Sequence, residues 1–125
     1  MSSGIVSIGQ IAIAVSDIQR AKDFYHQVLG LPCLFDAPPH LSFLQCGEVR
    51  LMLTTLQGAE SDHRTSVIYY KVSDMTQIVQ ELKNKGQLLV QEPQLVAKMP
   101  DHTLWMAFLR DPDQNLIGLM AEKAL

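Results

Sequence analysis

The sequence has few cysteines, few charged residues and no long apolar run. Cys33 and Cys46 are its two cysteines, without Cys-x-x-Cys spacing or a neighbouring histidine pair. We therefore expect no disulfide or zinc framework, and predict two buried, structural thiols in a reducing cytoplasm. No apolar run reaches the roughly 18 residues that span a bilayer, and residues 1–4 lack the basic start of a signal peptide.

Positive charge is also scarce. The formal net charge is −3, the sequence pI is about 5.7, and the ten Lys and Arg residues are scattered along the chain. Nucleic acids and anionic membranes require clustered basic residues, so neither is an expected partner. The sequence also lacks a Gly-rich phosphate loop and a G-x-S-x-G nucleophile motif.

What the sequence does contain is an internal repeat. Residues 11–17 read Ile-Ala-Ile-Ala-Val-Ser-Asp, and residues 68–74 read Ile-Tyr-Tyr-Lys-Val-Ser-Asp. Each copy is typical of a short strand, and its Ser-Asp pair is typical of a helix N-cap. Apolar residues then recur at helical spacing over 18–29 and 75–82, and each predicted helix stops at a glycine, Gly30 or Gly86.

Three strand-like segments follow each helix. They are 33–36, 41–46 and 49–54 in the first half, and 88–91, 103–109 and 116–121 in the second. The predicted fold class is α+β, with 125 residues and 47% apolar content giving one domain over 1–125. Its two βαβββ modules cover 5–56 and 66–122, and the polar segment 57–65 is the expected linker.

The strand faces predict where a ligand binds. Side chains alternate along a strand, so the bulky residues of the opening strands suit the helix side and leave a mixed opposite face. A curled mixed sheet with such a face predicts a ligand cleft; packing against a second subunit or solvent is the alternative. The candidate ligand-binding residues are Gln10, Phe43, Arg50, Met52, Tyr69, Lys71 and Trp105.

Each candidate has a chemical role and an alternative. Phe43, Tyr69 and Trp105 offer stacking surfaces, although Phe43 and Trp105 also suit a core. Arg50 and Lys71 offer positive charge to an anionic group, or snorkel to water at a sheet rim. Gln10 would orient the ligand.

Several of these motifs together resemble a known family. The paired units, the strand ending in Val-Ser-Asp, Phe24-Tyr25 before Leu29-Gly30-Leu31, and the Asp111-Pro112-Asp113 turn resemble the vicinal-oxygen-chelate superfamily. This group includes glyoxalase I, extradiol dioxygenases and bleomycin-resistance proteins. The resemblance covers residues 5–122 and implies two βαβββ modules curled around a cavity, usually in a homodimer.

The resemblance also implies where metal ligands would stand. The enzymes of the superfamily place one His, Gln or Glu ligand on each of four strands. The matching positions here are Gln10, Met52, Val67 and Gly118. Of these side chains, only the Gln10 amide offers a hard oxygen, so we expect no metal ligands, no cofactor and no catalytic residue of the usual kind.

Two functions from different classes follow, and a third is weaker. The first is a metal-free protein that binds a small aromatic or anionic compound and sequesters it. The second is a lyase or isomerase with relocated ligands or an acid–base mechanism, in which His102, Glu48 or Tyr69 would converge near Gln10. The third is an interaction module that binds a protein. The other histidines, His26, His40 and His63, are expected to be exposed.

Overall fold

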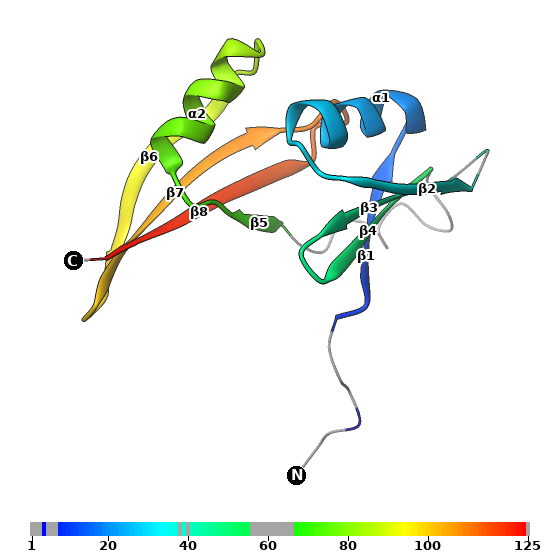
Figure 1. The fold of residues 1–125 in the computed structure, drawn as a ribbon. Helices are drawn as coiled ribbons and strands as arrows, with labels where there is room; N and C mark the ends of the chain where they lie inside the picture. Colours follow the sequence, from blue (N-terminus) through cyan, green and yellow to red (C-terminus); the bar gives the residue numbers. More distant parts are fainter. Residues whose placement is uncertain (1–3, 5–7, 38, 40, 56–66, 125) are drawn as a thin grey trace. The chain divides into compact units, whose positions relative to one another are not determined.

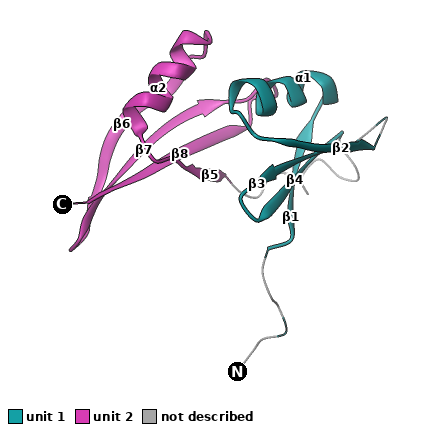
Figure 2. Cartoon of the chain, viewed as in Figure 1, with its two compact units in different colours: residues 1–65 teal, residues 66–125 magenta. Residues whose placement is uncertain are grey.

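A computed structural model of the protein describes residues 4, 8–37, 39, 41–55 and 67–124 (Figure 1). The chain divides into two compact units, residues 1–65 and 66–125 (Figure 2). Each unit has the order β-α-β-β-β, and each forms its own four-stranded mixed sheet. This confirms the α+β class with two βαβββ modules. The predicted linker 57–65 lies outside the described residues.

Unit 1 pairs its strands in the order β1-β4-β3-β2. The strands are β1 (Gln10–Val15), β2 (Cys33–Ala37), β3 (Leu41–Cys46) and β4 (Val49–Thr55). β1 runs parallel to β4, and the other pairs are antiparallel. Helix α1 (Ile18–Asp23) packs against β3 and β4, and the apolar side chains between helix and sheet are buried. These predicted strands agree with the structure to within a residue.

The first helix differs from the expected continuous α-helix. After Asp23 the backbone continues as a π-helix, η1 (Phe24–Val28), in which the Leu29 N–H donates to the Phe24 carbonyl at 3.0 Å. The wider turn brings two consecutive aromatic residues, Phe24 and Tyr25, to 5% and 1% exposure. A regular α-helix rotates neighbouring residues by 100°, so the π-turn is the local adjustment that helps bury both.

Unit 2 repeats the arrangement in the order β5-β8-β7-β6. Its elements are β5 (Ile68–Lys71), α2 (Met75–Asn84), β6 (Leu89–Lys98), β7 (His102–Arg110) and β8 (Leu116–Ala124). Helix α2 buries Met75, Val79 and Leu82. β5 is parallel to β8, as β1 is to β4 in unit 1.

The helical segments of both units begin at the predicted aspartate caps and stop before the predicted glycines. The carboxylates of Asp17 and Asp74 each accept a hydrogen bond at 3.0 Å, from the N–H of Arg20 and Gln77 respectively. These bonds satisfy backbone donors that have no partner within the helix. Gly30 and Gly86 both have φ of 81°, a conformation that side chains with a Cβ rarely adopt.

Strand β6 is much longer than expected. The predicted segment 88–91 continues to Lys98 and passes through Pro93. β6 is the edge strand of its sheet, where one side of the backbone needs no ladder partner, so a proline lacking an N–H is tolerated. The pairing with β7 also shifts register between Gln91 and Gln94. A proline interruption in an edge strand is therefore compatible with continued pairing.

Candidate functional site

The open face of the unit 1 sheet, turned away from α1, carries four of the candidate residues. Strand pairing places Gln10 beside Arg50 and Ala12 beside Met52, and it places Phe43 beside Met52 on the other side. The alternate residues Leu51 and Leu53 are at most 1% exposed on the helix side. The predicted strand register is therefore confirmed for β1 and β4.

Gln10 is held by its two neighbours on β4. Its Oε1 accepts a hydrogen bond from Arg50 Nε at 3.1 Å, and its Nε2 lies 3.5 Å from the sulfur of Met52. The amide oxygen, the one hard donor atom that the sequence places at a ligand position, thus faces a guanidinium. A cation at this oxygen would have to displace or oppose that positive charge.

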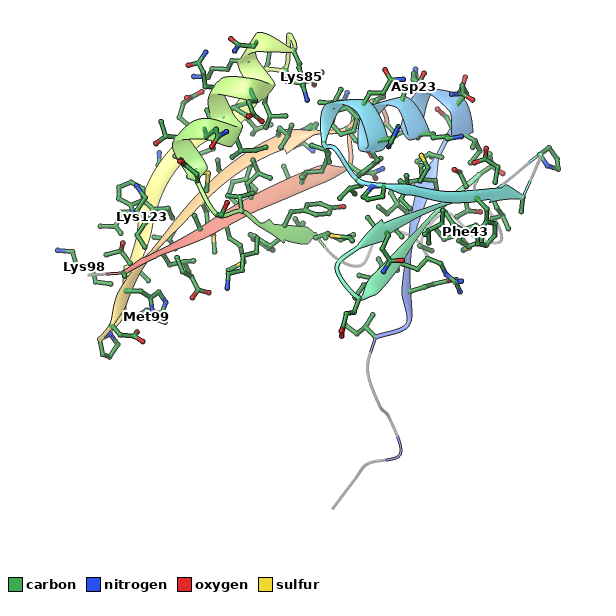
Figure 3. All side chains as sticks on the ribbon, viewed as in Figure 1. Asp23, Phe43, Lys85, Lys98, Met99 and Lys123 are labelled. Atoms are coloured by element: carbon green, nitrogen blue, oxygen red, sulfur yellow. The ribbon has the colours of Figure 1, made fainter. Side chains whose placement is uncertain are left out.

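Arg50 also extends over an aromatic pair. Its Cζ lies 5.2 Å from the centre of the Phe43 ring, which stacks on Phe35 with centroids 4.5 Å apart and planes 29° apart. Figure 3 shows Phe43 on the side of the sheet opposite α1. Phe43 is 8% exposed, whereas Phe35 is 52% exposed. Sequence reasoning missed Phe35, because the pairing of β2 with β3 that joins the two rings depends on a register shift after Cys33.

The open face of unit 2 is built around Tyr69. Its ring meets Phe108 edge to face, with centroids 5.7 Å apart and planes 76° apart. Tyr69 pairs with Gly118 on β8, and its ring covers that glycine closely. A Cβ built at Gly118 would lie 2.5 Å from Tyr69 Cδ2, far inside van der Waals contact. Tyr69 is still 44% exposed, and Lys71 and Val67 share its face.

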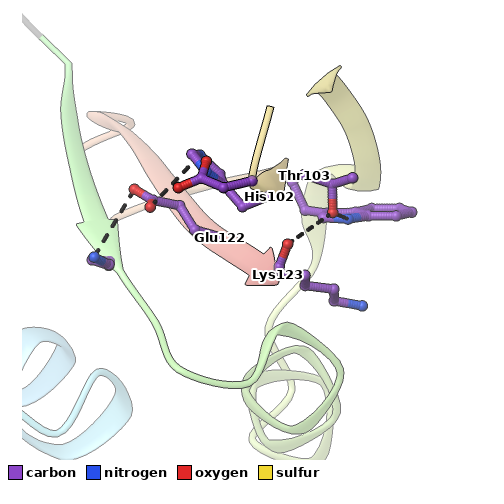
Figure 4. A network of polar contacts seen from close by, with 7 residues as sticks. His102, Thr103, Glu122 and Lys123 are labelled. Carbon is purple, nitrogen blue, oxygen red and sulfur yellow. Dashed lines mark hydrogen bonds and ion pairs between the residues drawn. The ribbon is translucent and has the colours of Figure 1, made fainter. Parts of the chain in front are cut away.

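A polar chain occupies the far end of this face (Figure 4). Lys71 Nζ lies 3.9 Å from one oxygen of Glu122, and His102 Nε2 lies 3.7 Å from the other. His102 Nδ1 donates to Asp101 at 2.7 Å, and this hydrogen bond lowers the pKa of the Asp101 carboxyl. Lys71 therefore faces a carboxylate, which leaves it less available to an anionic ligand than the sequence suggested.

Trp105 lies on the other face of the same sheet. It is two residues from Ala107, which is fully buried on the helix side, and it pairs with the buried Ala121. Its Nε1 donates to Thr103 at 3.1 Å, and Lys123 Nζ lies 4.9 Å from the ring centre. The sequence had grouped Trp105 with Tyr69. Side-chain alternation along β7 separates them, so Trp105 does not share a face with Tyr69.

The two cysteines and the remaining histidines differ in solvent exposure. Cys33 is exposed, so the prediction of a buried thiol is wrong there; it begins the edge strand β2, which leaves its side chain uncovered. Cys46 is partly buried, and burial raises the pKa of its thiol. His26 is exposed as expected, with Nδ1 2.7 Å from the Leu31 carbonyl. His40 and His63 lie outside the described residues.

Within each unit, shallow depressions lie at the edges of the helices. One of about 360 Å³ is lined by Lys71 and the first turns of α2, and one of about 330 Å³ by the start of α1 with Asp36 and Leu41. Both are open to solvent, and the first is lined mainly by polar side chains. The aromatic residues of the two open faces line neither depression.

The family of the chain follows from its sequence pattern. The family model for the glyoxalase/bleomycin resistance protein/dioxygenase superfamily matches residues 7–119. The chain belongs to this superfamily. This family is the vicinal-oxygen-chelate group that the repeat and turn motifs resemble. No curated protein sequence matches the chain.

Solved structures of superfamily type share the fold. The antibiotic-binding protein TnmS3 from Streptomyces sp. CB03234 has a TM-score of 0.76 and 23% identity, covering 98% of this chain and 100% of its own. Lactoylglutathione lyase from Agrobacterium tumefaciens has a TM-score of 0.76 and 17% identity, covering 92% of each chain. A Vibrio cholerae integron cassette protein has a TM-score of 0.76 and 18% identity, covering 97% and 98%. At these identities the likeness establishes the fold alone.

The positions that the superfamily resemblance assigns to metal ligands fit a divalent ion poorly here. Gln10 is bonded to Arg50, and Met52 offers a thioether. At Gly118 even a Cβ would collide with Tyr69, so a ligand side chain there would require the ring to move. Among the described residues, no group of three His, Cys, Asp or Glu side chains is placed to hold a metal.

No described helix is both long enough and apolar enough to cross a membrane.

Proposed function

We propose that this superfamily member is a metal-free protein that binds a small organic molecule. The observation that carries the proposal is the Tyr69 ring, which lies where a ligand side chain from residue 118 would project. The residue is a glycine, and the space above it is filled by an aromatic surface. Aromatic rings bury large areas of a bound organic compound, whereas they offer a transition metal no donor atom.

The unit 1 face supports the same function. Its two ligand positions, Gln10 and Met52, contact each other, and Gln10 also accepts a hydrogen bond from Arg50. A guanidinium beside the position repels a divalent cation and attracts an anionic or polar organic group. Binding of an antibiotic by TnmS3, a protein of the same fold, is consistent with this function.

Metal content and ligand-dependent stability test the proposal. We expect the full chain, purified without chelator and then offered Zn²⁺, Ni²⁺, Mn²⁺ or Fe²⁺, to retain no stoichiometric metal by elemental analysis. We expect its melting temperature to rise with concentration of aromatic or anionic compounds in a panel, because ligands that bind the folded state stabilise it. A stoichiometric metal that is lost in Gln10→Ala, or unchanged stability across the panel, would refute the proposal.

The polar chain of unit 2 favours a second candidate, an acid–base lyase or isomerase. His102 is oriented by Asp101 and lies 3.7 Å from Glu122, an arrangement that positions an imidazole for proton transfer. Glu48, another residue considered for this role, is exposed in the β3–β4 turn. Turnover of the methylglyoxal–glutathione adduct, lost in His102→Gln, would establish the enzyme. If no added metal gives turnover of this adduct, a glyoxalase I activity is excluded.

We also propose that the protein is a homodimer. The edge strand β6 and its flanks expose apolar side chains, namely Leu88, Val90, Leu95, Val96 and Met99. Edge strands with exposed apolar residues are usually covered in stable proteins. Sedimentation equilibrium at micromolar concentration tests this: a mass twice that of the chain is expected, and a monomer at all concentrations contradicts it.

A further inference from the structure

The open face of unit 1 carries a continuous row of four contacting side chains, one from each strand. Gln10 on β1 bonds to Arg50 on β4, Arg50 extends over Phe43 on β3, and Phe43 stacks on Phe35 on β2. We call these four residues the Arg50 row. All four lie within one unit, so the row is complete without any residue of unit 2.

Arg50 is the charged group of this row, and among the described residues no partner neutralises its charge. No carboxylate of the described residues lies within ion-pair distance of its guanidinium. By contrast, Lys22, Lys71 and Lys83 each face a carboxylate, namely those of Asp36, Glu122 and Glu92. Arg50 uses Nε to bond a neutral amide, which leaves both Nη groups with their donors. These two groups form the fork that matches a carboxylate in two parallel hydrogen bonds.

The surroundings of Arg50 hold that fork in place. The Gln10 amide fixes the position of Nε, and the Phe43 ring lies under the guanidinium. A side chain that is already ordered loses less entropy when it binds, so its affinity for an anion is higher than that of a mobile lysine. The site is therefore pre-formed for one negatively charged group.

The aromatic end of the row supplies an apolar surface beside the charge. Phe35 is 52% exposed, but its stacking on Phe43 keeps the ring from moving freely. The rings of Phe35 and Phe43 are 4.5 Å apart and the Arg50 guanidinium is 5.2 Å from the Phe43 ring, so the path from Phe35 to Arg50 is short. That path is at most about 10 Å, the reach of a two-ring aromatic compound with an attached acid group.

We infer that the Arg50 row binds a planar aromatic carboxylate, with the carboxylate on the Nη groups of Arg50 and the aromatic ring against Phe35. The inference rests on the proposed small-molecule function and narrows it to one ligand chemistry and one face. Positive ring edges and a guanidinium both favour a negatively charged, π-rich compound over a neutral or cationic one.

The probes are 2-naphthoate, its neutral amide 2-naphthamide, and cyclohexanecarboxylate, titrated calorimetrically into the full chain. We expect 2-naphthoate to bind most tightly and its affinity to fall as salt rises. 2-Naphthamide lacks the negative charge and cyclohexanecarboxylate lacks the flat aromatic ring. Each should therefore bind at least about tenfold more weakly than 2-naphthoate. Amide chemical-shift changes in nuclear magnetic resonance spectra should centre on Phe35, Phe43 and Arg50.

Variants assign the contacts. Arg50→Gln should weaken 2-naphthoate binding by about tenfold to a hundredfold, since a charge-assisted pair is lost. Arg50→Lys keeps the positive charge but loses the two parallel Nη donors, so its affinity for 2-naphthoate should lie between those of the native chain and Arg50→Gln. Phe35→Leu should weaken binding by about threefold to tenfold while leaving the salt dependence unchanged. The control is Arg20→Gln, the same substitution of an exposed arginine on α1, which should bind like the native chain.

Two outcomes overturn the inference and leave the proposed function standing. One is binding of other panel compounds while 2-naphthoate fails to bind or binds no better than 2-naphthamide. The other is 2-naphthoate binding that is unchanged in Arg50→Gln or maps to unit 2. Stoichiometric metal binding instead removes the proposed function itself. The melting temperature of each ligand-free variant, compared with that of the native chain, distinguishes a loss of affinity from a loss of folding.

Discussion

The two units have one fold but opposite side-chain arrangements at their central parallel strand pair. In unit 1, the small Ala12 on β1 stands beside the long Met52 on β4. In unit 2, the large Tyr69 on β5 stands beside Gly118 on β8. Each pair holds one bulky side chain, but it comes from the first strand in one unit and the last strand in the other. The space above a strand pair admits one large group, whichever strand supplies it.

The difference matters for function because Met52 and Gly118 are equivalent positions. The superfamily resemblance predicts a ligand position at each of them. Met52 places a thioether beside Gln10. Gly118 has no side chain, and the Tyr69 ring covers it.

The connections before the last strands differ most, so we expect the largest effect there. Unit 2 uses Asp111, 2% exposed, whose carboxylate accepts from the N–H groups of Asp113 and Asn115 at 2.9 and 2.8 Å and from Asn115 Nδ2. Unit 1 uses the short Gly47-Glu48 turn. Asp111→Ala should lower the free energy of unfolding by about 3 kcal/mol, because buried donors lose a charged acceptor. Denaturant unfolding measures this.

The control for this prediction is Glu48→Ala, which removes an exposed carboxylate from the unit 1 turn. Its effect should stay within about 0.5 kcal/mol. Equal losses for the two variants would show that the buried carboxylate has no special role.

Gly118→Ala should destabilise the protein by about 2 kcal/mol, because the new Cβ overlaps the Tyr69 ring. The matched control is Gly9→Ala, where nothing lies within 4 Å of the added atom. Combining Gly118→Met with Tyr69→Ala recreates the unit 1 arrangement and should restore most of the stability lost in Gly118→Met alone. Thermal unfolding of these four variants and of Tyr69→Ala alone checks this. Additive losses in the double variant would refute the exchange of positions.

The helix caps should behave alike in the two units. Asp17→Ala and Asp74→Ala each remove one 3.0 Å hydrogen bond to a backbone N–H, so each should cost about 1 kcal/mol. Asparagine keeps the acceptor oxygen and should retain most of that stability. Urea unfolding gives the values. A loss in Asp74→Asn as large as in Asp74→Ala would show that something other than the cap bond is involved.

The smallest expected effect is the pH dependence of the Lys22–Asp36 pair in unit 1. A hydrogen bond from Lys22, with a second from Ser42, lowers the pKa of Asp36, and the same bond to Asp36 raises the pKa of Lys22. The contribution of Asp36 is therefore present above its ordinary pKa of 3.8 and lost as pH falls through the lowered value. That of Lys22 is present below 10.5 and lost as pH rises through the raised value.

Asp36 is half exposed, so solvent screening should keep the contribution of the pair to stability small. The native chain should lose more stability than Asp36→Asn when unfolding is compared at neutral and strongly acidic pH. High salt should reduce the difference. Identical pH profiles for the two proteins would contradict the assignment.

The regular elements could be predicted because their signals are local. The Ser-Asp caps, the glycine stops and most strand bounds depend on residues within a few positions of each other. The length of β6 could not be predicted, since Pro93 is acceptable only in a strand that proves to be at a sheet edge. The π-turn at Phe24 could not be predicted either, because it depends on the burial of two adjacent rings, those of Phe24 and Tyr25.

By itself, the sequence determined the two βαβββ modules and the face on which Gln10, Arg50, Met52 and Tyr69 lie, since alternation and helical spacing are short-range properties. Tertiary structure alone decided which side chains meet across strands. Strand register joined Phe35 to Phe43 and laid Tyr69 over Gly118. The β2–β3 pairing shifts register after Cys33, and the β5–β8 pairing joins the first and last strands of unit 2, so neither contact follows from side-chain alternation alone.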